Sequence, residues 1–423
     1  MTDELMADVY KDGVLAAYLR RDANGLIHFT YRADYEGPAI ATSLPLDAEY
    51  TAESIPPFFQ NLLPEGYRLD VVSSEKKISK NNTLGLLLVI GSDVPGDVQI
   101  IEHGRELYTA PAALVNNPEV VSFAELMGTV DRRGLPGVQE KLSAVMKTLP
   151  VHWTGAGYDA LLKISPQRMP GLVENEAAHL TAAALMGIPV AQHELVYDRD
   201  GVSGLMVSRF DRTPSGGRIA MEDGAQILGV PSGEKYTEDN PAVTTESVIQ
   251  AMVKLAASPA IARRNLYMHF LYAWLTGNGD LHAKNISLLK GRRGWEVAPI
   301  YDIPCSLVHI KSLSMALSVN GKDNSNPGDG SPPEDWKITV DDWLALAETI
   351  GLPSKVQKDA LTRALKAARA VRWPTDRAAP GYVFNSNASP FKAMQKELER
   401  RQDEFEEYLH TRKAPDFLSL RYF

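Results

Sequence analysis

The sequence predicts an α+β fold in which a β-rich N-terminal part precedes a helical C-terminal half. Three observations support this fold class. The first hundred or so residues contain short β-prone runs separated by turn signals. Residues from about 120 to 210 give the order strand, strand, helix, strand, strand, and helical patterns dominate from about 210 onward. We therefore expect three domains, a β-rich N-terminal subdomain followed by two lobes, at residues 1–110, 111–210 and 211–423.

The N-terminal subdomain begins with a predicted hairpin, because Asp12-Gly13 lies between two β-prone runs. Residues 26–31 alternate between apolar and polar side chains, as a half-buried strand does. Prolines at the start of residues 56–63 favour a helix there. Residues 81–90 form either a second helix or a buried strand, and periodicity does not separate the two. We expect a linker at residues 110–118.

The middle of the chain predicts strands at residues 141–146 and 159–164. A helix is expected at residues 173–186, where Gly187 and Pro189 end it. Two more strands follow at residues 194–197 and 205–210, with an Asp-Gly turn between them. This order of elements is that of the N-terminal lobe of protein kinases, which is an analogy of fold.

Helices are expected through most of the remaining sequence. Residues 261–276 are apolar nearly all round, which predicts a buried central helix. Residues 322–333 are rich in Gly, Pro, Asn, Asp and Ser and predict a loop. Helices are expected near 354–371 and 390–411, and the mixed charges of the last indicate a solvated face.

Composition narrows the class of protein. The chain has 423 residues, of which 44% are hydrophobic, and a net charge of −9. The acidic balance argues against a protein that grips nucleic acid with its whole surface. The single cysteine, Cys305, allows no internal disulfide and fits a reducing cytoplasmic compartment. No apolar run approaches the roughly 20 residues that cross a bilayer, and the acidic N-terminus argues against a secretory signal.

The segment 277–285 carries the strongest functional signal, with Asp280 five residues ahead of Asn285. The catalytic loop of protein kinases uses this spacing, where Asp is the base and Asn holds a magnesium ion. Gly277 and Gly279 end the apolar helix and would leave Asp280 in a loop. The alternative is an ordinary loop after a helix, since the spacing is common by chance. His282 would orient this loop.

A second acidic residue, Asp302, follows a predicted hairpin formed by residues 286–289 and 295–300. The start of one strand in an antiparallel hairpin lies beside the end of the other. Asn285 and Asp302 would therefore share one end of the hairpin and one Mg²⁺ ion, which prefers oxygen ligands. The alternative is a surface hairpin with polar ends.

Lys163 stands in an apolar strand, where an unpaired ammonium group would be costly. In a kinase such a lysine binds ATP phosphates and a helix glutamate. Glu176 is the expected partner and Glu174 the rival, whereas an edge-strand lysine would face water. The glycine-containing segment 134–141 is a candidate phosphate cradle, or a simple loop. Residues 207–212 are a candidate hinge for adenine, or a strand end closed by an Arg–Asp pair.

Taken together, these motifs resemble the HipA family of serine/threonine kinases, the toxin half of HipBA toxin–antitoxin modules. The likeness extends through most of the chain. It rests on segments in family order: residues 58–66 (FFQNLLPEG), 137–141 (GVQEK), 170–176 (PGLVENE), 209–212 (RFDR), 277–285 (GNGDLHAKN) and 301–302 (YD).

The resemblance implies a protein-kinase-like two-lobed fold with a β-rich N-terminal subdomain and an all-helical C-terminal lobe. It implies ATP and Mg²⁺, with Asp280 and His282 as catalytic residues and Asn285 and Asp302 as metal ligands. The nucleotide-binding residues that it implies, besides Asp280 and His282, are Gly137, Val138, Gln139, Glu140, Lys141, Lys163, Glu176, Ser208, Arg209, Phe210 and Tyr301.

The implied partner is a HipB-like helix-turn-helix antitoxin that supplies most of the DNA contact. The implied substrate is a protein, with aminoacyl-tRNA synthetases among the family's substrates. HipA-type kinases often autophosphorylate a serine before the GxQxK motif, but Gly134 stands here, so that off-switch is absent or uses Thr129 or Ser143. Two rival interpretations are a small-molecule phosphotransferase of kinase-like fold and a catalytically silent corepressor that binds the antitoxin.

Overall fold

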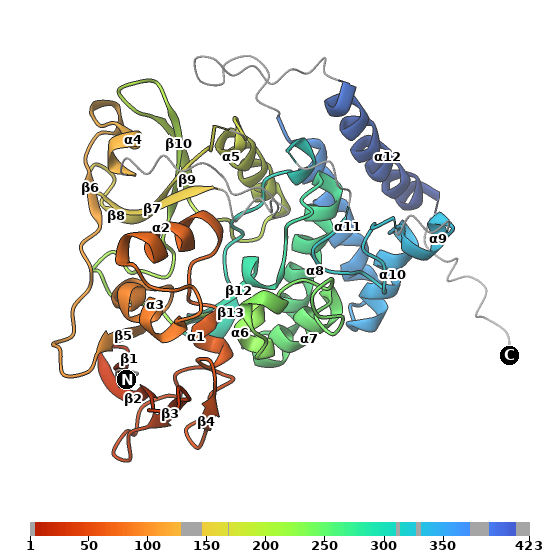
Figure 1. The fold of residues 1–423 in the computed structure, drawn as a ribbon. Helices are drawn as coiled ribbons and strands as arrows, with labels where there is room; N and C mark the ends of the chain where they lie inside the picture. The colour runs from red at the N-terminus through yellow and green to blue at the C-terminus, as the bar shows by residue number, and fades with distance from the viewer. Residues whose placement is uncertain are drawn as a thin grey trace, which may run out of the picture.

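The computed structural model describes residues 5–127, 146–167, 169–309, 314–326, 331–372 and 389–411. Two five-stranded sheets and one three-stranded sheet are combined with helices that concentrate toward the C-terminus (Figure 1). This arrangement confirms the predicted α+β class.

The N-terminal sheet has the strand order β4-β3-β2-β1-β5, and all its neighbours are antiparallel. Asp12 and Gly13 have φ angles of 49° and 77°, the left-handed pair that a tight hairpin turn requires, so the predicted hairpin is confirmed. The strands are β1 (Leu5–Lys11), β2 (Val14–Arg21), β3 (Ile27–Tyr31), β4 (Glu49–Ala52) and β5 (Val98–Glu102).

Three helices lie between β4 and β5 in the chain: α1 (Pro57–Gln60), α2 (Gly66–Lys76) and α3 (Thr83–Ile90). Residues of α1 and α3 belong to the core of this sheet, whereas α2 lies against α3. Within residues 81–90 a helix forms from Thr83 to Ile90, so the choice that periodicity left open is decided. The side chain of Asn82 caps α3 by accepting a hydrogen bond of 3.1 Å from the Gly85 N–H. Leu87 of α3 then packs in the same buried core as Val9 and Phe29 of the sheet.

The second sheet has the order β6-β7-β8-β10-β9, and α5 packs against it. Its strands are β6 (Ala113–Val115), β7 (Lys147–Trp153), β8 (Tyr158–Ile164), β9 (His193–Tyr197) and β10 (Ser203–Ser208), and the helix α5 spans Leu172–Ala183. The order strand, strand, helix, strand, strand is present from β7 to β10, although β7 follows the predicted 141–146 strand rather than coinciding with it. The predicted strand at 141–146 lies, except for Met146, outside the described residues.

The predicted linker at 110–118 needs a correction, because it contains β6. This strand pairs in parallel with β7, from Ala113 opposite Val151 to Val115 opposite Trp153. Val115 is fully buried in the core of the second sheet. The prolines of this segment favoured a linker in the sequence analysis. The strand has only three residues, and its partner lies more than 30 residues away, so no local pattern indicated it.

The C-terminal region is organised around α8 (Pro259–Thr276), which is buried along most of its length. The surrounding helices are α6 (Gly224–Leu228), α7 (Thr245–Leu255), α9 (Pro333–Trp336), α10 (Val340–Thr349), α11 (Ser354–Arg369) and α12 (Ser389–Thr411). None of the helices within the described ranges has the length and apolarity that crossing a bilayer requires.

This region is not helical throughout, because it holds the three-stranded sheet β11-β12-β13. The strands are β11 (Met221–Asp223), β12 (Ser287–Gly291) and β13 (Gly294–Val297). β12 and β13 form the hairpin that the sequence predicted, although the second strand ends three residues earlier than expected.

The last helix, α12, is amphipathic rather than wholly solvated. Arg401 is 2% exposed, lies 4.8 Å from the ring centroid of Trp274, and donates a hydrogen bond to the Trp274 carbonyl. Phe405 is fully buried beside the same tryptophan. The apolar stem and the planar guanidinium group of Arg401 therefore pack in the core. The charge of this residue had suggested an exposed position instead.

Candidate active site

The loop that follows α8 is held tightly by its glycines. Gly277 ends the helix with a left-handed φ of 73°, and a Cβ there would lie 3.0 Å from the Cys305 sulfur. A Cβ on Gly279 would lie 2.4 Å from the Ser314 carbonyl oxygen. Glycine is therefore required at both positions, because Cys305 and Leu307 at Gly277, and Ser306 and Ser314 at Gly279, leave no room for a side chain.

This loop fixes the carboxylate of Asp280. Asp280 is 7% exposed, and its backbone N–H donates to the Asn278 side chain at 2.8 Å. The hydroxyl of Tyr236 donates to Asp280 Oδ1 at 3.0 Å. The carboxylate thus has one defined orientation, which a general base requires. No sequence pattern pointed to Tyr236, which lies 44 residues earlier in the chain.

His282 packs edge-on against Tyr236, with 4.9 Å between the ring centroids and an interplanar angle of 89°. Burial, reinforced by the positive charge of Lys235, holds the pKa of His282 well below its usual value. The imidazole is therefore neutral near pH 7. His282 contacts the tyrosine that holds Asp280, as a residue that orients the loop would.

Lys163 joins three elements of the site. Its Nζ lies 2.7 Å from Glu176 Oε1 on α5 and 3.2 Å from Asp302 Oδ1. The predicted pairing with Glu176 is present, and the rival Glu174 is not the partner. Burial raises the pKa of Glu176, and Lys163 opposes that rise. Asp302 has a φ of 52°, an uncommon conformation for a residue other than glycine that concentrates at functional sites.

The segments that carry Asn285 and Asp302 are joined through the residues next to them. Asn285 Nδ2 donates to the Asp280 carbonyl at 3.1 Å, so its carboxamide oxygen is the atom that could face a cation. The hydroxyl of Tyr301 donates to the Lys284 carbonyl at 2.9 Å. Tyr301 thus fastens the segment that carries Asp302 to the residue beside Asn285.

The donor set suits a hard cation. Carboxylate and carboxamide oxygens are ligands that Mg²⁺ accepts, and this ion usually keeps waters and phosphate oxygens as well. Across the described ranges, no three His, Cys, Asp or Glu residues lie close enough to hold a metal by themselves. A cation between Asn285 and Asp302 would therefore depend on a bound phosphate for further ligands.

The candidate hinge lies at the end of β10. The Ser208 N–H donates to the Gln192 carbonyl at 2.8 Å, and the Arg209 N–H donates to the Asp159 carbonyl at 2.9 Å. The ring of Phe210 lies 5.6 Å from that of Tyr301, which places the hinge beside the segment that carries Asp302.

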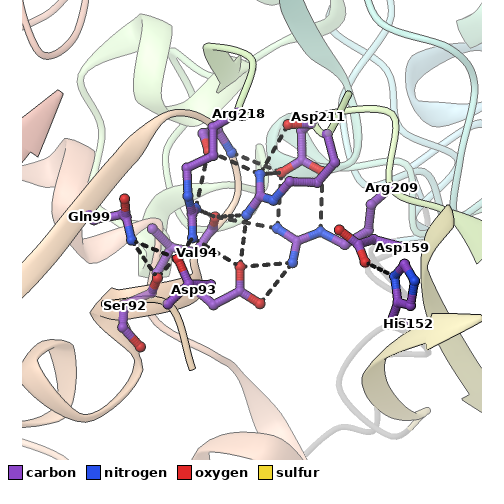
Figure 2. Close-up of polar contacts among 12 residues, drawn as sticks. Ser92, Asp93, Val94, Gln99, His152, Asp159, Arg209, Asp211 and Arg218 are labelled. Atoms are coloured by element: carbon purple, nitrogen blue, oxygen red, sulfur yellow. Dashed lines mark hydrogen bonds and ion pairs between the residues drawn. The ribbon is translucent and has the colours of Figure 1, made fainter. Parts of the chain in front are cut away.

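The Arg209 side chain points toward Asp93 and Asp211, as Figure 2 shows. Its guanidinium pairs with Asp93 at 2.9 Å and with Asp211 at 3.0 Å. The alternative interpretation of this segment, a strand end closed by an Arg–Asp pair, thus describes the side chain. The Arg209 side chain therefore does not serve the predicted adenine contact.

The candidate phosphate cradle, Gly137, Val138, Gln139, Glu140 and Lys141, lies outside the described residues, as do Gly134, Thr129 and Ser143. Two charged residues that the sequence did not single out stand at the catalytic loop instead. Glu65 accepts from Lys284 at 2.8 Å and also pairs with Lys235. Glu65 was visible only as part of the Pro-Glu-Gly motif, and Lys235 gave no signal.

Two protein-family models match the sequence of this chain. Residues 7–101 match the model of the HipA N-terminal domain, and residues 134–372 match that of the HipA-like C-terminal domain.

Two curated relatives cover most of the chain. "Putative kinase Y4mE" of Sinorhizobium fredii is 30% identical over 74% of this chain and 80% of its own length. "Serine/threonine-protein kinase toxin HipA" of Shewanella oneidensis is 26% identical over 80% of this chain and 81% of its own length. Both are therefore similar across the N-terminal and the C-terminal parts.

One solved structure shares the fold nearly end to end. It is the Shewanella oneidensis toxin–antitoxin complex of HipA, HipB and operator DNA, with a TM-score of 0.73 and 21% identity. The match covers 96% of this chain and 98% of that chain. The kinase-like fold predicted from the sequence is thereby confirmed.

Proposed function

This chain belongs to the HipA family, and on that premise we propose that it is an ATP-dependent serine/threonine protein kinase that acts as the toxin of a toxin–antitoxin pair. One observation carries the proposal. A buried Lys163–Glu176–Asp302 cluster and the fixed Asp280 carboxylate are linked through Tyr301 and the catalytic loop. Kinases need these parts together, because their catalysis consists of positioning and charge stabilisation.

Each residue has a role in this proposal. Lys163 binds the phosphates of ATP and is held for that task by Glu176. Asp280 accepts the proton of the attacking hydroxyl, and its hydrogen bond from Tyr236 sets the direction of the carboxylate. Asn285 and Asp302 would hold Mg²⁺, which supplies positive charge against the transferring phosphoryl group when bound.

The remaining predicted contacts complete the nucleotide site in this proposal. Ser208, Arg209 and Phe210 meet the adenine through backbone groups, and Tyr301 lies under the same region. Residues 137–141 line the phosphates. Gly134 stands where HipA-type kinases often have the serine that they autophosphorylate. Self-inhibition of this kind would therefore depend on another hydroxyl, such as that of Thr129 or Ser143.

The proposed partner is a HipB-like helix-turn-helix antitoxin, because the relative of the same fold was solved with HipB and operator DNA. The net charge of −9 fits a protein that reaches DNA mainly through such a partner. The proposed substrate is a protein of translation, with an aminoacyl-tRNA synthetase as the first to test.

The decisive experiment compares wild type with Asp280→Asn in lysate that contains labelled ATP. We expect wild type to label a discrete protein band, and Asp280→Asn to lower the rate by about 10³-fold, since it removes the base without changing shape. The exposed Asp47→Asn is the matched control and should keep full activity.

Two outcomes would change the proposal. Label that enters only a small metabolite would indicate a small-molecule phosphotransferase instead. Equal growth arrest by wild type and Asp280→Asn, with no ATP turnover by either, would leave the non-catalytic corepressor as the better reading.

A further inference from the structure

Three charged side chains join the N-terminal domain to the catalytic loop. Glu65, at the start of α2, accepts from Lys284 of the loop at 2.8 Å and pairs with Lys235. The side chains of Lys235 and Lys284 are only 8% and 12% exposed. This charged triad is therefore an internal contact between parts of the chain about 170 and 219 residues apart.

Both lysines are tied to the phosphoryl-transfer site through their own backbones. The Lys235 carbonyl accepts from the Ala283 N–H at 3.2 Å, and the next residue, Tyr236, donates to Asp280. The Lys284 carbonyl accepts from Tyr301 at 2.9 Å, beside Asp302. A displacement of either lysine would thus move a residue of the phosphoryl-transfer site.

The charge balance makes Glu65 necessary. Two ammonium groups share one carboxylate in a place that water hardly reaches. Burial lowers the pKa of Lys235, and Glu65 opposes that shift. Burial also disfavours ionised Glu65, but Lys284 and Lys235 outweigh it and lower its pKa to about 2. Without the carboxylate, two like charges would remain close together and desolvated, which drives them apart.

The backbone that carries Glu65 is fastened to the C-terminal region just before it. Asn61 Nδ2 donates to the Val230 carbonyl at 2.9 Å, and Gln226 Nε2 donates to the Phe58 carbonyl at 3.1 Å. Glu65 therefore reaches the two lysines from a docked segment, and its position is preset.

We propose that Glu65 is a positioning residue that the N-terminal domain supplies to the catalytic loop, where it holds Lys235 and Lys284 beside Asp280. The inference rests on the proposed kinase function and deepens it. The phosphoryl-transfer site is then composite, because the catalytic loop is fully ordered only while the N-terminal domain is docked on it.

The test is Glu65→Gln, which keeps the shape and removes the charge. We expect kcat for phosphoryl transfer to fall by about tenfold or more, with a much smaller change in KM for ATP, because a misplaced loop impairs the transition state rather than nucleotide binding. Thr42→Ala is the matched control. Thr42 also crosses to the C-terminal region, but it donates to Glu222 of β11, at 2.6 Å, rather than to the catalytic loop.

Lys235→Gln provides the second variant, because it leaves Glu65 and Lys284 as a balanced pair. In that background Glu65→Gln should cost less than in wild type, since one of the two cations is gone. Equal losses in both backgrounds would mean that Glu65 does not act through Lys235, which overturns the proposal.

Hydrogen exchange at residues 279–286 gives a readout that needs no activity. We expect Glu65→Gln to exchange these amides about tenfold faster than wild type or Thr42→Ala, because a loosened loop opens more often. Unchanged exchange overturns the proposal, whatever the rate. If wild type transfers no phosphate but Glu65→Gln still loosens the loop, the kinase function fails and the positioning role stands.

Discussion

At the scale of single residues, the site depends on buried charges that have partners. Lys163 is 8% exposed and Glu176 is fully buried, so each would be unstable without the other. Their pair lies next to Asp302, so one ammonium group faces two carboxyl groups. Such an arrangement favours a bound cation and holds the lysine rigid, which are both useful for handling phosphates.

Lys163→Met tests this cluster through stability. The variant leaves two carboxylates facing each other in a buried place, so we expect the free energy of unfolding in urea to fall by about 3–5 kcal/mol. Phosphoryl transfer should be lost as well. The exposed Lys80, which pairs with Asp70 at the surface, gives the control Lys80→Met with no measurable change. A Lys163→Met protein as stable as wild type would refute the buried-pair argument.

At the scale of elements, the central helix α8 carries a polar residue in a fully apolar setting. His269 is 2% exposed, and its Nε2 has no hydrogen-bond partner in the described part of the chain. Burial lowers the pKa of His269 to about 3. His269 therefore stays unprotonated in the folded protein at pH values where the unfolded chain, with a pKa near 6.5, binds a proton.

This difference fixes the sign of a pH dependence. Above about pH 6.5, His269 is neutral in both the folded and the unfolded protein. As the pH falls below this value, His269 is protonated in the unfolded protein before it is protonated in the folded protein. Stability should fall as the pH drops from about 6.5 toward 3, by up to about 1.4 kcal/mol per pH unit from this group. His269→Phe should remove that share of the slope in urea unfolding series between pH 7 and pH 4.

The control for this series is His410→Gln, because the His410 side chain is 78% exposed. It should leave the slope as it is in wild type. A His269→Phe slope that equals the wild-type slope would show that His269 is not the group that resists protonation.

At the scale of the whole molecule, a second charged cluster holds the N-terminal domain against the segment after the hinge (Figure 2). Asp93 accepts from Arg209 and Arg212 at 2.9 Å and 2.8 Å, and from Arg218 at 3.3 Å. Asp211 shares the first two arginines. Burial, with the nearby charge of Arg212, lowers the pKa of Arg218 to about 10. Three cations thus depend on two carboxylates and nearby carbonyls.

Asp93→Asn should therefore weaken the docking of the N-terminal domain. Three buried arginines would share one carboxylate, so we expect unfolding to begin at lower urea, with a loss of about 3 kcal/mol, and proteases to cut earlier between residues 90 and 120. Asp34→Asn, at an exposed pair with Arg32, should behave as wild type. Identical urea midpoints and cleavage patterns for Asp93→Asn and wild type would rule out this role for the cluster.

Local sequence patterns were enough to predict the type of most elements and the residues of the catalytic loop. Turn chemistry at Asp12-Gly13, the apolar run of α8 and the spacing from Asp280 to Asn285 are local features, and local features set backbone conformation within a few residues. The roles of these site residues stay predictions that the variants above can test.

Only the tertiary structure decided which distant residues meet. It selected Glu176 rather than Glu174 for Lys163, turned Arg209 toward Asp93, made residues 83–90 a helix, and brought Glu65 to Lys235 and Lys284. Each of these outcomes except the helix joins residues 13 to 219 positions apart. Such contacts depend on the path of the whole chain and on which buried polar groups need a partner. A local stretch of sequence contains neither kind of information.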